Sequence, residues 1–388
     1  MAYRNSMEIV SDTNNLEKAC KLLAQHPHCT VDTEFLREST FWPELCLIQM
    51  AGPDHAFIVD VLADGISLDP FFELMADRDT LKVFHAARQD IEIVHHLCGE
   101  IPNPVFDTQV AAMVCGYGDS IYYDQLVNRI TGVRLDKSHR FTDWSKRPLS
   151  NQQLEYALAD VTHLNDVFAE IEAKLEQMDR HHWVAEEMDI LTSPSTYDVP
   201  PENAWYRLKL RAKKPRELLI TQKVAEWREI TARHNNVPRG RVIKDDAIYD
   251  IATRAPSNIK QLIGLRSLSR GFDKARYGDS LLECIAMAKA IPEEDLPRMP
   301  RQRRMPEGNS AATEMLKVLL KIIAEEHGVA AKIIATVDDL DKIAGDDKAD
   351  VAALKGWRKK LFGDKALELK SGHLGLVYRD RRIQVVEL

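Results

Sequence analysis

Three short apolar segments follow one another near the start of the chain, and they constrain its fold more than any other feature. They run from Thr30 to Phe35, from Leu45 to Met50 and from Ala56 to Val61, with turn-forming residues between them. Short apolar runs bounded by turn residues are typical of β-strands, and their close succession favours neighbouring antiparallel strands over a strictly alternating β/α pattern. The sequence therefore predicts a sheet that is formed early in the chain.

Helical periodicity dominates after this sheet. One further apolar run, from Leu81 to His85, predicts a buried strand, and shorter helices are predicted over 16–23, behind the cap region at Asp12, and over 69–75. Longer stretches with helical spacing cover 86–97, 108–115, 122–130 and 152–178. The first half of the chain is thus predicted to be an α/β domain with a mixed sheet and helices packed after it.

Composition limits the class of protein. A chain of 388 residues with 45% hydrophobic and 29% charged residues is typical of a globular protein with two or three domains. Its sequence lacks an apolar run long enough to cross a bilayer and an apolar signal core, so we expect no membrane partner and a cytoplasmic location. The six cysteines lack CxxC spacing, which argues against a zinc site or a disulfide framework.

Two segments rich in turn-forming residues divide the rest of the chain. They lie at 193–201 and at about 291–309, and the sequence between and after them is mostly helical, with a short strand pair conceivable over 374–386. We therefore predict domains at 1–192, 203–291 and 310–388. The net charge of −8 argues mildly against a general nucleic-acid binder. Two basic runs could each be a solvated helix face or a contact for a polyanion: Arg207, Lys209, Arg211, Lys213, Lys214 and Arg216, and then Arg298, Arg301, Arg303 and Arg304.

Two carboxylates in the first predicted strand are the first candidates for chemistry. Asp32 and Glu34 are two residues apart, so on a strand their side chains share one face. Like charges side by side repel each other unless a cation lies between them, and Mg²⁺ or Mn²⁺ takes oxygen ligands of this kind. Taken alone, the pair fits a solvated strand end as well as half of a metal site.

Two later segments add further acids. Asp90 follows a predicted strand at the start of a helix, and Tyr156 and Asp160 are four residues apart within a long helix, so they stack on one of its faces. That face continues through Leu164 and borders the core, where a lone carboxylate is unfavourable unless a metal or another partner compensates it. Four acids match the charge of two dications, which lie about 3.5–4 Å apart in two-metal phosphoryl-transfer sites. Tyr156 stays neutral at pH 7 and can orient a water molecule.

These motifs resemble a known family. The patterns Asp-Thr-Glu-Phe at 32–35, His-x-x-x-x-Asp at 85–90 and Tyr-x-x-x-Asp at 156–160 are similar to those of the DEDDy subgroup of 3′–5′ exonucleases. The segments 106–109, 135–138 and 142–149 resemble the bacterial ribonuclease D branch of that subgroup. The helical tail resembles tandem HRDC domains, more clearly over 203–285 than from 311 onward, where Gly356, Trp357 and Arg358 are the main points of likeness.

The resemblance implies a ribonuclease H-like exonuclease domain followed by two small all-α, HRDC-like domains. It implies a two-metal site with Mg²⁺ or Mn²⁺, in which Asp32, Glu34 and Asp160 hold the first ion and Asp32 bridges to the second. Asp90 would act largely through coordinated water, and Tyr156 would orient the nucleophilic water. The implied substrate is the 3′ end of structured RNA, especially precursor tRNA, released as 5′-mononucleotides. The HRDC-like parts would bind RNA through phosphate contacts.

Several other residues are candidates with two interpretations each. His85 could be a catalytic base or a structural residue. The structural role is favoured because a metal ion and Tyr156 would already activate and orient the attacking water. Loop cations could meet substrate phosphates or be solvated, and aromatic residues after the first acids could stack a terminal base or pack in the core. Asp107 and Asp136 are expected to be helix caps or turn residues. The tentative substrate contacts are Phe35, His85, Lys137, Arg140 and Arg147, and Phe41 and Trp42 are further residues that could stack a base.

Three functions are compatible with the motifs. A 3′–5′ exoribonuclease is favoured over a DNA-directed proofreading exonuclease because the chain holds no polymerase segment, although contacts to the 2′-OH are invisible in a sequence. A non-catalytic RNA-binding protein is disfavoured because a dead site has no reason to keep like charges together. The chain is expected to be a monomer. On this basis, removing everything from residue 203 onward should mainly weaken RNA affinity.

Overall fold

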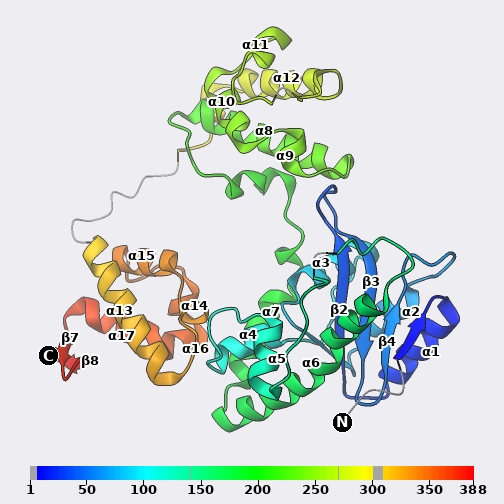
Figure 1. The fold of residues 1–388 in the computed structure, drawn as a ribbon. Helices are drawn as coiled ribbons and strands as arrows, with labels where there is room; N and C mark the ends of the chain where they lie inside the picture. Colours follow the sequence, from blue (N-terminus) through cyan, green and yellow to red (C-terminus); the bar gives the residue numbers. More distant parts are fainter. Residues whose placement is uncertain (1–6, 141, 270, 300–308) are drawn as a thin grey trace.

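The computed structural model describes residues 7–140, 142–269, 271–299 and 309–388. Over these ranges it contains three lobes, drawn in Figure 1 as a blue-to-green α/β body, a green-to-yellow helical body and an orange-to-red body that ends at the C-terminus. None of the helices in the described ranges is both long enough and apolar enough to cross a membrane.

Six strands of the first lobe form one mixed sheet in the order β1-β4-β3-β2-β5-β6. The pairs β2–β3 and β3–β4 are antiparallel, as the close succession of apolar runs predicted, whereas β1–β4, β2–β5 and β5–β6 are parallel. The strands are β1 (Met7–Val10), β2 (His28–Leu36), β3 (Glu44–Ala51), β4 (Ala56–Val59), β5 (Leu81–Phe84) and β6 (Val105–Asp107).

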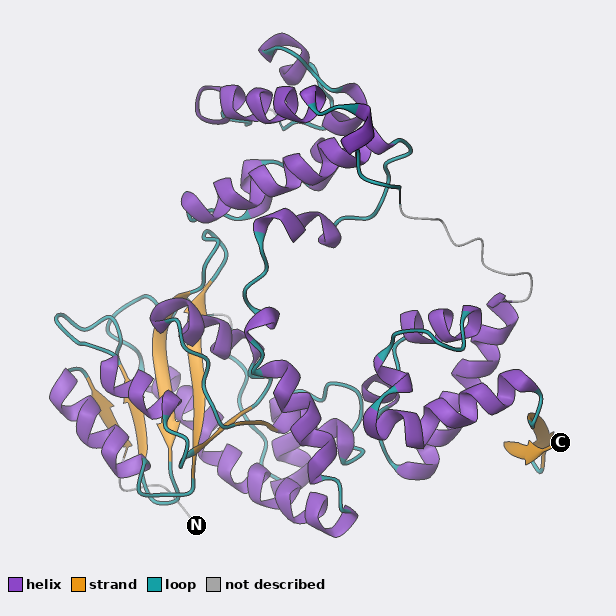
Figure 2. Cartoon of the chain, turned by 180° about the vertical axis from the view of Figure 1, so that it is seen from behind, coloured by secondary structure: helices purple, strands orange, loops and turns teal. Residues whose placement is uncertain are grey.

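Helices cover this sheet, as Figure 2 shows from behind. The longest, α6, crosses β2, β3 and β4, and it begins at a capping box in which Ser150 and Gln153 satisfy each other's backbone N–H groups. The predicted cap at Asp12 is confirmed, since its side chain accepts from Asn15 N. The helices are α1 (Thr13–Leu23), α2 (Asp69–Ala76), α3 (Arg88–Cys98), α4 (Thr108–Val114), α5 (Tyr123–Thr131), α6 (Asn151–Met178) and α7 (His181–Leu191).

The second lobe is all-helical, as predicted, and has its own apolar core. That core is built from α8, α10 and α12 around residues such as Val224, Ile251 and Ile285. Two 3₁₀ turns, Pro194–Thr196 and Pro201–Arg207, lead into it from the first lobe. Its helices are α8 (Pro215–His234), α9 (Arg239–Val242), α10 (Asp245–Arg254), α11 (Ile259–Ile263) and α12 (Lys274–Ala290), followed by a 3₁₀ turn at Glu293–Asp295.

The third lobe is helical but ends in a β-hairpin, so the expectation of an all-α domain is wrong for its last residues. The conceivable strand pair near the C-terminus is confirmed as β7 and β8, which pair in antiparallel register. The elements are α13 (Asn309–His327), α14 (Ala331–Ile334), α15 (Val337–Gly345), a 3₁₀ turn (Ala352–Leu354), α16 (Gly356–Arg358), a π-helical turn (Lys359–Gly363), α17 (Asp364–Ser371), β7 (Leu374–Arg379) and β8 (Arg382–Glu387).

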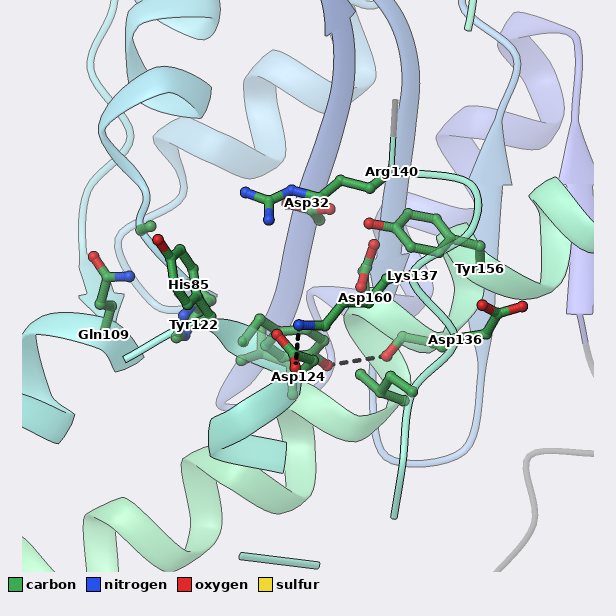
Figure 3. Close-up of a pocket in the computed structure, with 15 residues that line it drawn as sticks. Asp32, His85, Gln109, Tyr122, Asp124, Asp136, Lys137, Arg140, Tyr156 and Asp160 are labelled. Carbon is green, nitrogen blue, oxygen red and sulfur yellow. Dashed lines mark hydrogen bonds and ion pairs between the residues drawn. The ribbon is translucent and has the colours of Figure 1, made fainter. Parts of the chain in front are cut away.

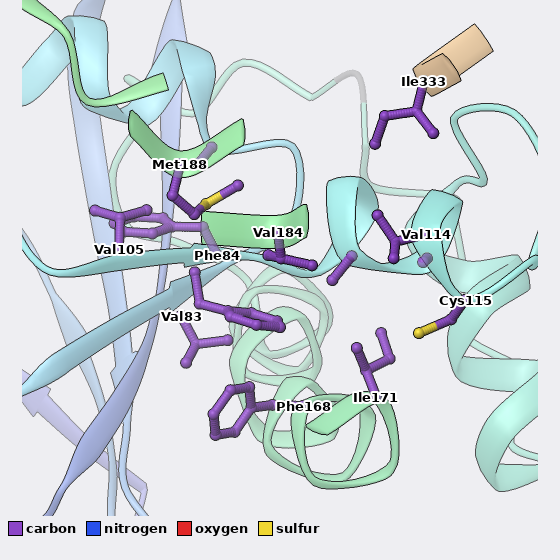
Figure 4. Close-up of a cluster of buried hydrophobic side chains, with 14 of the residues drawn as sticks. Val83, Phe84, Val105, Val114, Cys115, Phe168, Ile171, Val184, Met188 and Ile333 are labelled. Carbon is purple, nitrogen blue, oxygen red and sulfur yellow. The ribbon is translucent and has the colours of Figure 1, made fainter. Parts of the chain in front are cut away.

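The third lobe shares one continuous apolar core with the first. Buried residues of α13, α14 and α16 belong to the same cluster as the sheet, and Figure 4 shows Ile333 of α14 facing the region of Val114 and Cys115. Trp357 stacks on Trp183 of α7 with ring centroids 4.2 Å apart. The two lobes therefore bury apolar surface against each other, which the sequence division into separate domains did not foresee.

Polar contacts fix the same interface. Ala330 N donates to Met113 O at 2.9 Å, and Arg358 forms an ion pair with Glu187 and donates to Ile333 O. Gly116, with a φ of 77°, lies so close to the third lobe that a Cβ atom on it would collide with the carbonyl oxygen of Gly328. Only glycine fits this position without a shift of one backbone.

Candidate active site

The acidic site is built where α6 crosses the face of β2. Asp32 and Glu34 lie on that face because strand side chains alternate, and the helical spacing of Tyr156 and Asp160 brings both toward it. One ligand oxygen from each of Asp32, Glu34 and Asp160 can be chosen so that all three lie within 4.8 Å of one another. The predicted grouping of these three acids is therefore present in the structure.

Asp90 reaches the same site from the edge of the sheet. Strand β5 pairs with β2 over His28–Thr30 alone, so the first turn of α3 can lie beside the following residues of β2. The Thr33 hydroxyl donates to Asp90 Oδ1 at 2.5 Å, and Asp90 is only 6% exposed. Asp90 is not one of the three acids with mutually close ligand atoms, which agrees with the indirect role that the family resemblance implies.

Burial and mutual repulsion make this site electrostatically unfavourable by itself. Burial, followed by the charges of the neighbouring acids, raises the pKa of Asp32 well above its usual range and that of Glu34 to about 9. Burial also raises the pKa of Asp90 and of Asp160 to about 7. Four acids that resist ionisation together are compensated most directly by cations with oxygen ligands. The donor set thus fits hard divalent metal ions.

Tyr156 and Arg140 modify the electrostatics of this acidic cluster. Burial, followed by the charge of Asp160, raises the pKa of the Tyr156 phenol, so Tyr156 keeps its proton at neutral pH. A hydrogen bond from Tyr156 and the positive charge of Arg140 oppose the upward shift of the pKa of Asp160. Tyr156 is therefore a fixed hydrogen-bond donor at the edge of the acidic cluster.

Two of the four acids, Asp32 and Asp160, line a pocket of about 360 Å³. Figure 3 shows Asp32, Tyr156 and Asp160 on one side of it and His85, Gln109 and Tyr122 on the other. Arg140 extends between the two sides, with its guanidinium 5.8 Å from the Tyr122 ring centroid. Lys137 also lines the pocket and forms an ion pair of 2.6 Å with Asp124.

His85 has a structural position. Its Nδ1 lies 2.9 Å from Thr108 Oγ1 and its Nε2 3.2 Å from Ile121 O, so both ring nitrogens have partners. Burial lowers its pKa, which keeps the ring neutral. This arrangement supports the structural interpretation of His85 over that of a catalytic base.

Asp107 holds the turn between β5 and α3. Its carboxylate accepts from Ala86 N at 3.0 Å and Ala87 N at 2.9 Å, and it also caps α4 by accepting from Gln109 N. Ala86 has a φ of 63° at the pocket wall, a conformation that a non-glycine residue adopts only under such constraint. The predictions of a cap at Asp107 and of a turn at Asp136, which accepts from Ser138 N, are confirmed.

Two tentative substrate contacts lie elsewhere. Arg147 forms a bidentate ion pair with Asp60 and donates to Trp144 O and Cys46 O, so its guanidinium fixes the loop before α6 to β3 and to the end of β4, and it does not line the pocket. Phe35 is also absent from the residues that line the pocket.

The base-stacking hypothesis for Phe41 and Trp42 is wrong. Both lie at the tip of the β2–β3 hairpin, which reaches the second lobe (Figure 1), and their backbone N–H groups donate to Asn236 Oδ1 at 3.1 Å each. Trp42 stacks on His96 and Phe41 is buried against Ala232 and Val242. These aromatic rings join two lobes.

The basic runs are partly internal. Arg211 pairs with Asp246, and Arg216 donates to Ala288 O and Ile291 O, so these two residues stabilise the second lobe. Arg298 is exposed, while Arg301, Arg303 and Arg304 lie outside the described residues.

Sequence reasoning missed part of the pocket. Tyr122, which is 56% exposed, Gln109 and Tyr123, whose hydroxyl donates to Ala159 O at 2.9 Å, all line it. They come from α4 and the start of α5, which the chain brings opposite the acids only through its tertiary fold. An aromatic pair at the start of a predicted helix was the only local signal.

Comparisons with known proteins agree with this architecture. A family model described as a 3′–5′ exonuclease matches residues 7–176, and the HRDC domain model matches residues 217–285. Ribonuclease D of Nitrobacter hamburgensis is 55% identical over 381 residues, which cover 98% of this chain and 100% of that protein. Ribonuclease D of Bartonella henselae is 47% identical over 387 residues, covering 100% of this chain and 95% of the relative.

Solved structures show the same arrangement. The crystal structure of Escherichia coli RNase D, described as an exoribonuclease involved in structured RNA processing, superposes with a TM-score of 0.83 at 28% identity, covering 94% of this chain and 99% of that one. The catalytic core of RRP6 from Trypanosoma brucei shares the fold, with a TM-score of 0.56 at 21% identity over 75% of this chain and 82% of that one. The family resemblance inferred from the motifs is confirmed.

Proposed function

The chain belongs to the ribonuclease D family and is a 3′–5′ exoribonuclease with a ribonuclease H-like exonuclease domain, and we propose that it hydrolyses RNA with two divalent metal ions held by the acids of β2, α3 and α6. The observation that carries the metal assignment is the cluster of Asp32, Glu34 and Asp160, whose ligand oxygens lie within 4.8 Å of one another. Their buried, mutually repelling charges support a cation as the partner.

Each acid has a distinct proposed role. Asp32, Glu34 and Asp160 would hold the first ion, and Asp32 would also face the second, with Asp90 contributing its charge from the α3 side. The Thr33 hydroxyl donates to Asp90 and orients its carboxylate, so this hydrogen bond would help to hold the second ion. When bound, Mg²⁺ or Mn²⁺ would supply the Lewis acidity that activates water and stabilises charge on the phosphate.

Pocket residues that are not acids would position the substrate. Tyr156 keeps its proton and can donate a hydrogen bond toward the attacking water, which is the orienting role predicted for it. Arg140, whose charge acts on Glu34 and Asp160, and Lys137, which pairs with Asp124, bring positive charge to the pocket beside the acids, where the terminal phosphates of a strand would lie. We assign these two residues to phosphate contacts and leave Phe35 and Arg147 out of the substrate site.

The proposed substrates are 3′ ends of precursor tRNAs and other structured RNAs, released as 5′-mononucleotides. The relative from Escherichia coli is described as acting in structured RNA processing, and the HRDC match supports a nucleic-acid contact by the second lobe. We retain domains at 1–192, 203–291 and 310–388, with the third HRDC-like in sequence and docked on the first. A cytoplasmic monomer stays a prediction.

A digestion of matched RNA and DNA strands, each labelled at the 3′ or the 5′ end, tests this proposal. With Mg²⁺ or Mn²⁺ the 3′-labelled RNA should release labelled 5′-mononucleotides first, and the chelator EDTA should stop release. Asp160→Asn should be inactive, whereas Asp143→Asn, on a turn in which Asp143 binds Ser145 away from the pocket, should remain active. Undiminished release in EDTA would refute the metal assignment, and equal rates on DNA would refute the assignment to RNA.

A further inference from the structure

Gln49 of β3 is buried beside the acidic site with an amide that nothing in the described chain satisfies. Its side chain is 0% exposed, and neither Nε2 nor Oε1 has a hydrogen-bond partner among the described residues. A buried amide without a partner destabilises the folded state. Such a residue needs an explanation, because leucine or methionine would fill the same space without that penalty.

The register of the sheet places Gln49 directly across from Asp32. The two residues are paired in the antiparallel β2–β3 ladder, so their side chains lie on the same face with Cβ atoms about 4.5–5.5 Å apart. This is the face that α6 covers. The acids emerge from it, and Gln49 therefore lies beneath the proposed metal site.

The neighbours of Gln49 along β3 and on β4 are apolar. Leu47 and Ala51 flank it along β3, and Ile58 is its partner on β4. Above them α6 contributes Ala157 and Val161, which belong to the same small apolar clusters as Leu47, Ile58 and Ala51. Thr30, diagonal to Gln49, uses its hydroxyl on Ala51 O and Val161 O. Glu34, which pairs with Leu47, is the other diagonal neighbour, so Asp32, directly opposite Gln49, is the nearest carboxylate that can accept from the amide.

We propose that Gln49 is a positioning residue for Asp32, donating from Nε2 to the Asp32 carboxylate when the site holds metal. A metal-ligating carboxylate commonly accepts a hydrogen bond from a neighbouring group, which fixes its orientation and tunes its basicity. Gln49 then acts through Asp32, and it contacts neither the metal ions nor the RNA. The inference rests on the metal assignment made under the proposed function.

An apolar replacement separates this role from a packing role, because the two predict opposite changes. Gln49→Leu and Gln49→Met remove the amide while nearly conserving volume. In EDTA they should be as stable as the wild type or more so, because an unsatisfied buried group is removed. With metal they should be impaired, because Asp32 loses its donor. Leu47→Met is the matched control, since it changes packing on the same strand and face and removes no donor.

The experiment measures Mn²⁺ binding without RNA, by the electron paramagnetic resonance signal of free Mn²⁺, together with thermal unfolding in EDTA. We expect both Gln49 variants to bind Mn²⁺ about 10–100-fold more weakly than the wild type, with undiminished midpoints in EDTA and with Leu47→Met unchanged. Wild-type affinity in the Gln49 variants would overturn the inference. Loss of folding of both variants in EDTA would also overturn it, because the amide would then have a partner without metal. A wild type that binds no Mn²⁺ would instead refute the metal site itself.

Discussion

Replacing Glu229 by glutamine should loosen the attachment of the second lobe to the exonuclease lobe. Glu229 lies on α8 and is 2% exposed. Its carboxylate accepts from Arg233 Nε at 3.0 Å and Nη2 at 2.8 Å, and from Arg239 Nη2 at 2.7 Å, with Arg239 Nε as a further close partner. The two guanidinium groups lie 5.7 and 4.4 Å from the ring centroid of Phe41, at the tip of the β2–β3 hairpin. Glu229 is therefore the anion that holds two cations against the first lobe.

The size of the effect follows from burial. Breaking a buried ion pair by removing one partner typically destabilises by about 3–5 kcal/mol. Here the arginine side chains are 28% and 29% exposed, so water can solvate them in part, and the lower end of that range applies. A loss of about 3 kcal/mol corresponds to roughly a 100-fold change in an equilibrium constant, since about 1.4 kcal/mol is a factor of ten. Glutamine keeps the volume of the glutamate side chain, but it removes the negative charge and can direct its amide N–H groups toward the two guanidinium groups.

Native-state hydrogen exchange of the hairpin tip measures this change. The N–H groups of Phe41 and Trp42 donate to Asn236, so they exchange when the lobes separate. In Glu229→Gln they should exchange 10-fold to about 100-fold faster than in the wild type, the upper value if the whole loss is transmitted to the interface. Glu226→Gln is the matched control on the same helix, because its pair with Lys223 is partly exposed and contributes about 1 kcal/mol at most. Equal protection in the two variants would show that Glu229 does not hold the interface.

Four further changes have defined outcomes. Asp160→Asn should lower RNA turnover by more than about 100-fold. Its midpoint of thermal unfolding in EDTA should not fall, because the substitution removes one of the mutually repelling buried charges. A large drop of that midpoint would show that the acids do not destabilise the metal-free protein. Tyr156→Phe should lower kcat by about 10–100-fold, the value of one hydrogen bond to a charged or polarised group, with Mn²⁺ affinity retained in a direct titration. Trp357→Ala should lower the free energy of unfolding of the first and third lobes together by about 3–5 kcal/mol, as measured by urea unfolding. The control Tyr378→Ala, at a side chain that is 72% exposed, should lower it by less than about 0.5 kcal/mol. Burial lowers the pKa of Lys82 to about 8, below the value of about 10.5 in the unfolded chain, so the folded state loses this proton first and its stability rises as pH increases from about 8 toward 10.5. The unfolding free energy of the wild type minus that of Lys82→Met should therefore increase in this window by up to about 1.4 kcal/mol per pKa unit. A difference that stays constant with pH would show that the lysine is not buried.

Local patterns predicted the parts of the fold that local forces determine. The alternation of strand side chains placed Asp32 and Glu34 on one face, and helical spacing placed Tyr156 above Asp160. A cap residue at Asp12 marked the start of a helix, because the orphan N–H groups of a first turn need a nearby acceptor. The acids of the site were found for the same reason, since each lies within a short segment of defined secondary structure.

Contacts between distant segments could not be predicted in this way. Arg147 was expected either to contact a substrate phosphate or to be solvated, but its partner Asp60 is 87 residues away in the chain. Phe41 meets Asn236 across 195 residues, and no local pattern distinguishes an aromatic residue that stacks a base from one that joins two lobes.

The third lobe is the clearest case of this limit, because its amphipathic helices bury their apolar sides partly against the exonuclease lobe. Removing everything from residue 203 onward would therefore expose core surface of the first lobe, so we predict a loss of stability beside the expected weaker RNA affinity.

One strand connects the chemistry to the attachment of the second lobe. β2 carries Asp32 and Glu34 and continues through an irregularity in its pairing between Glu34 and Phe35 into the hairpin whose tip binds the second lobe. A bulge beside an active site bends its strand and sets the direction of the residues beyond it. Because the acids lie before this bend and the lobe contact lies after it, undocking can move the second lobe while the carboxylates stay in place. Glu229→Gln should therefore raise KM for structured RNA and leave kcat unchanged, and a parallel loss of kcat would mean that the bend transmits the disturbance back to the acids.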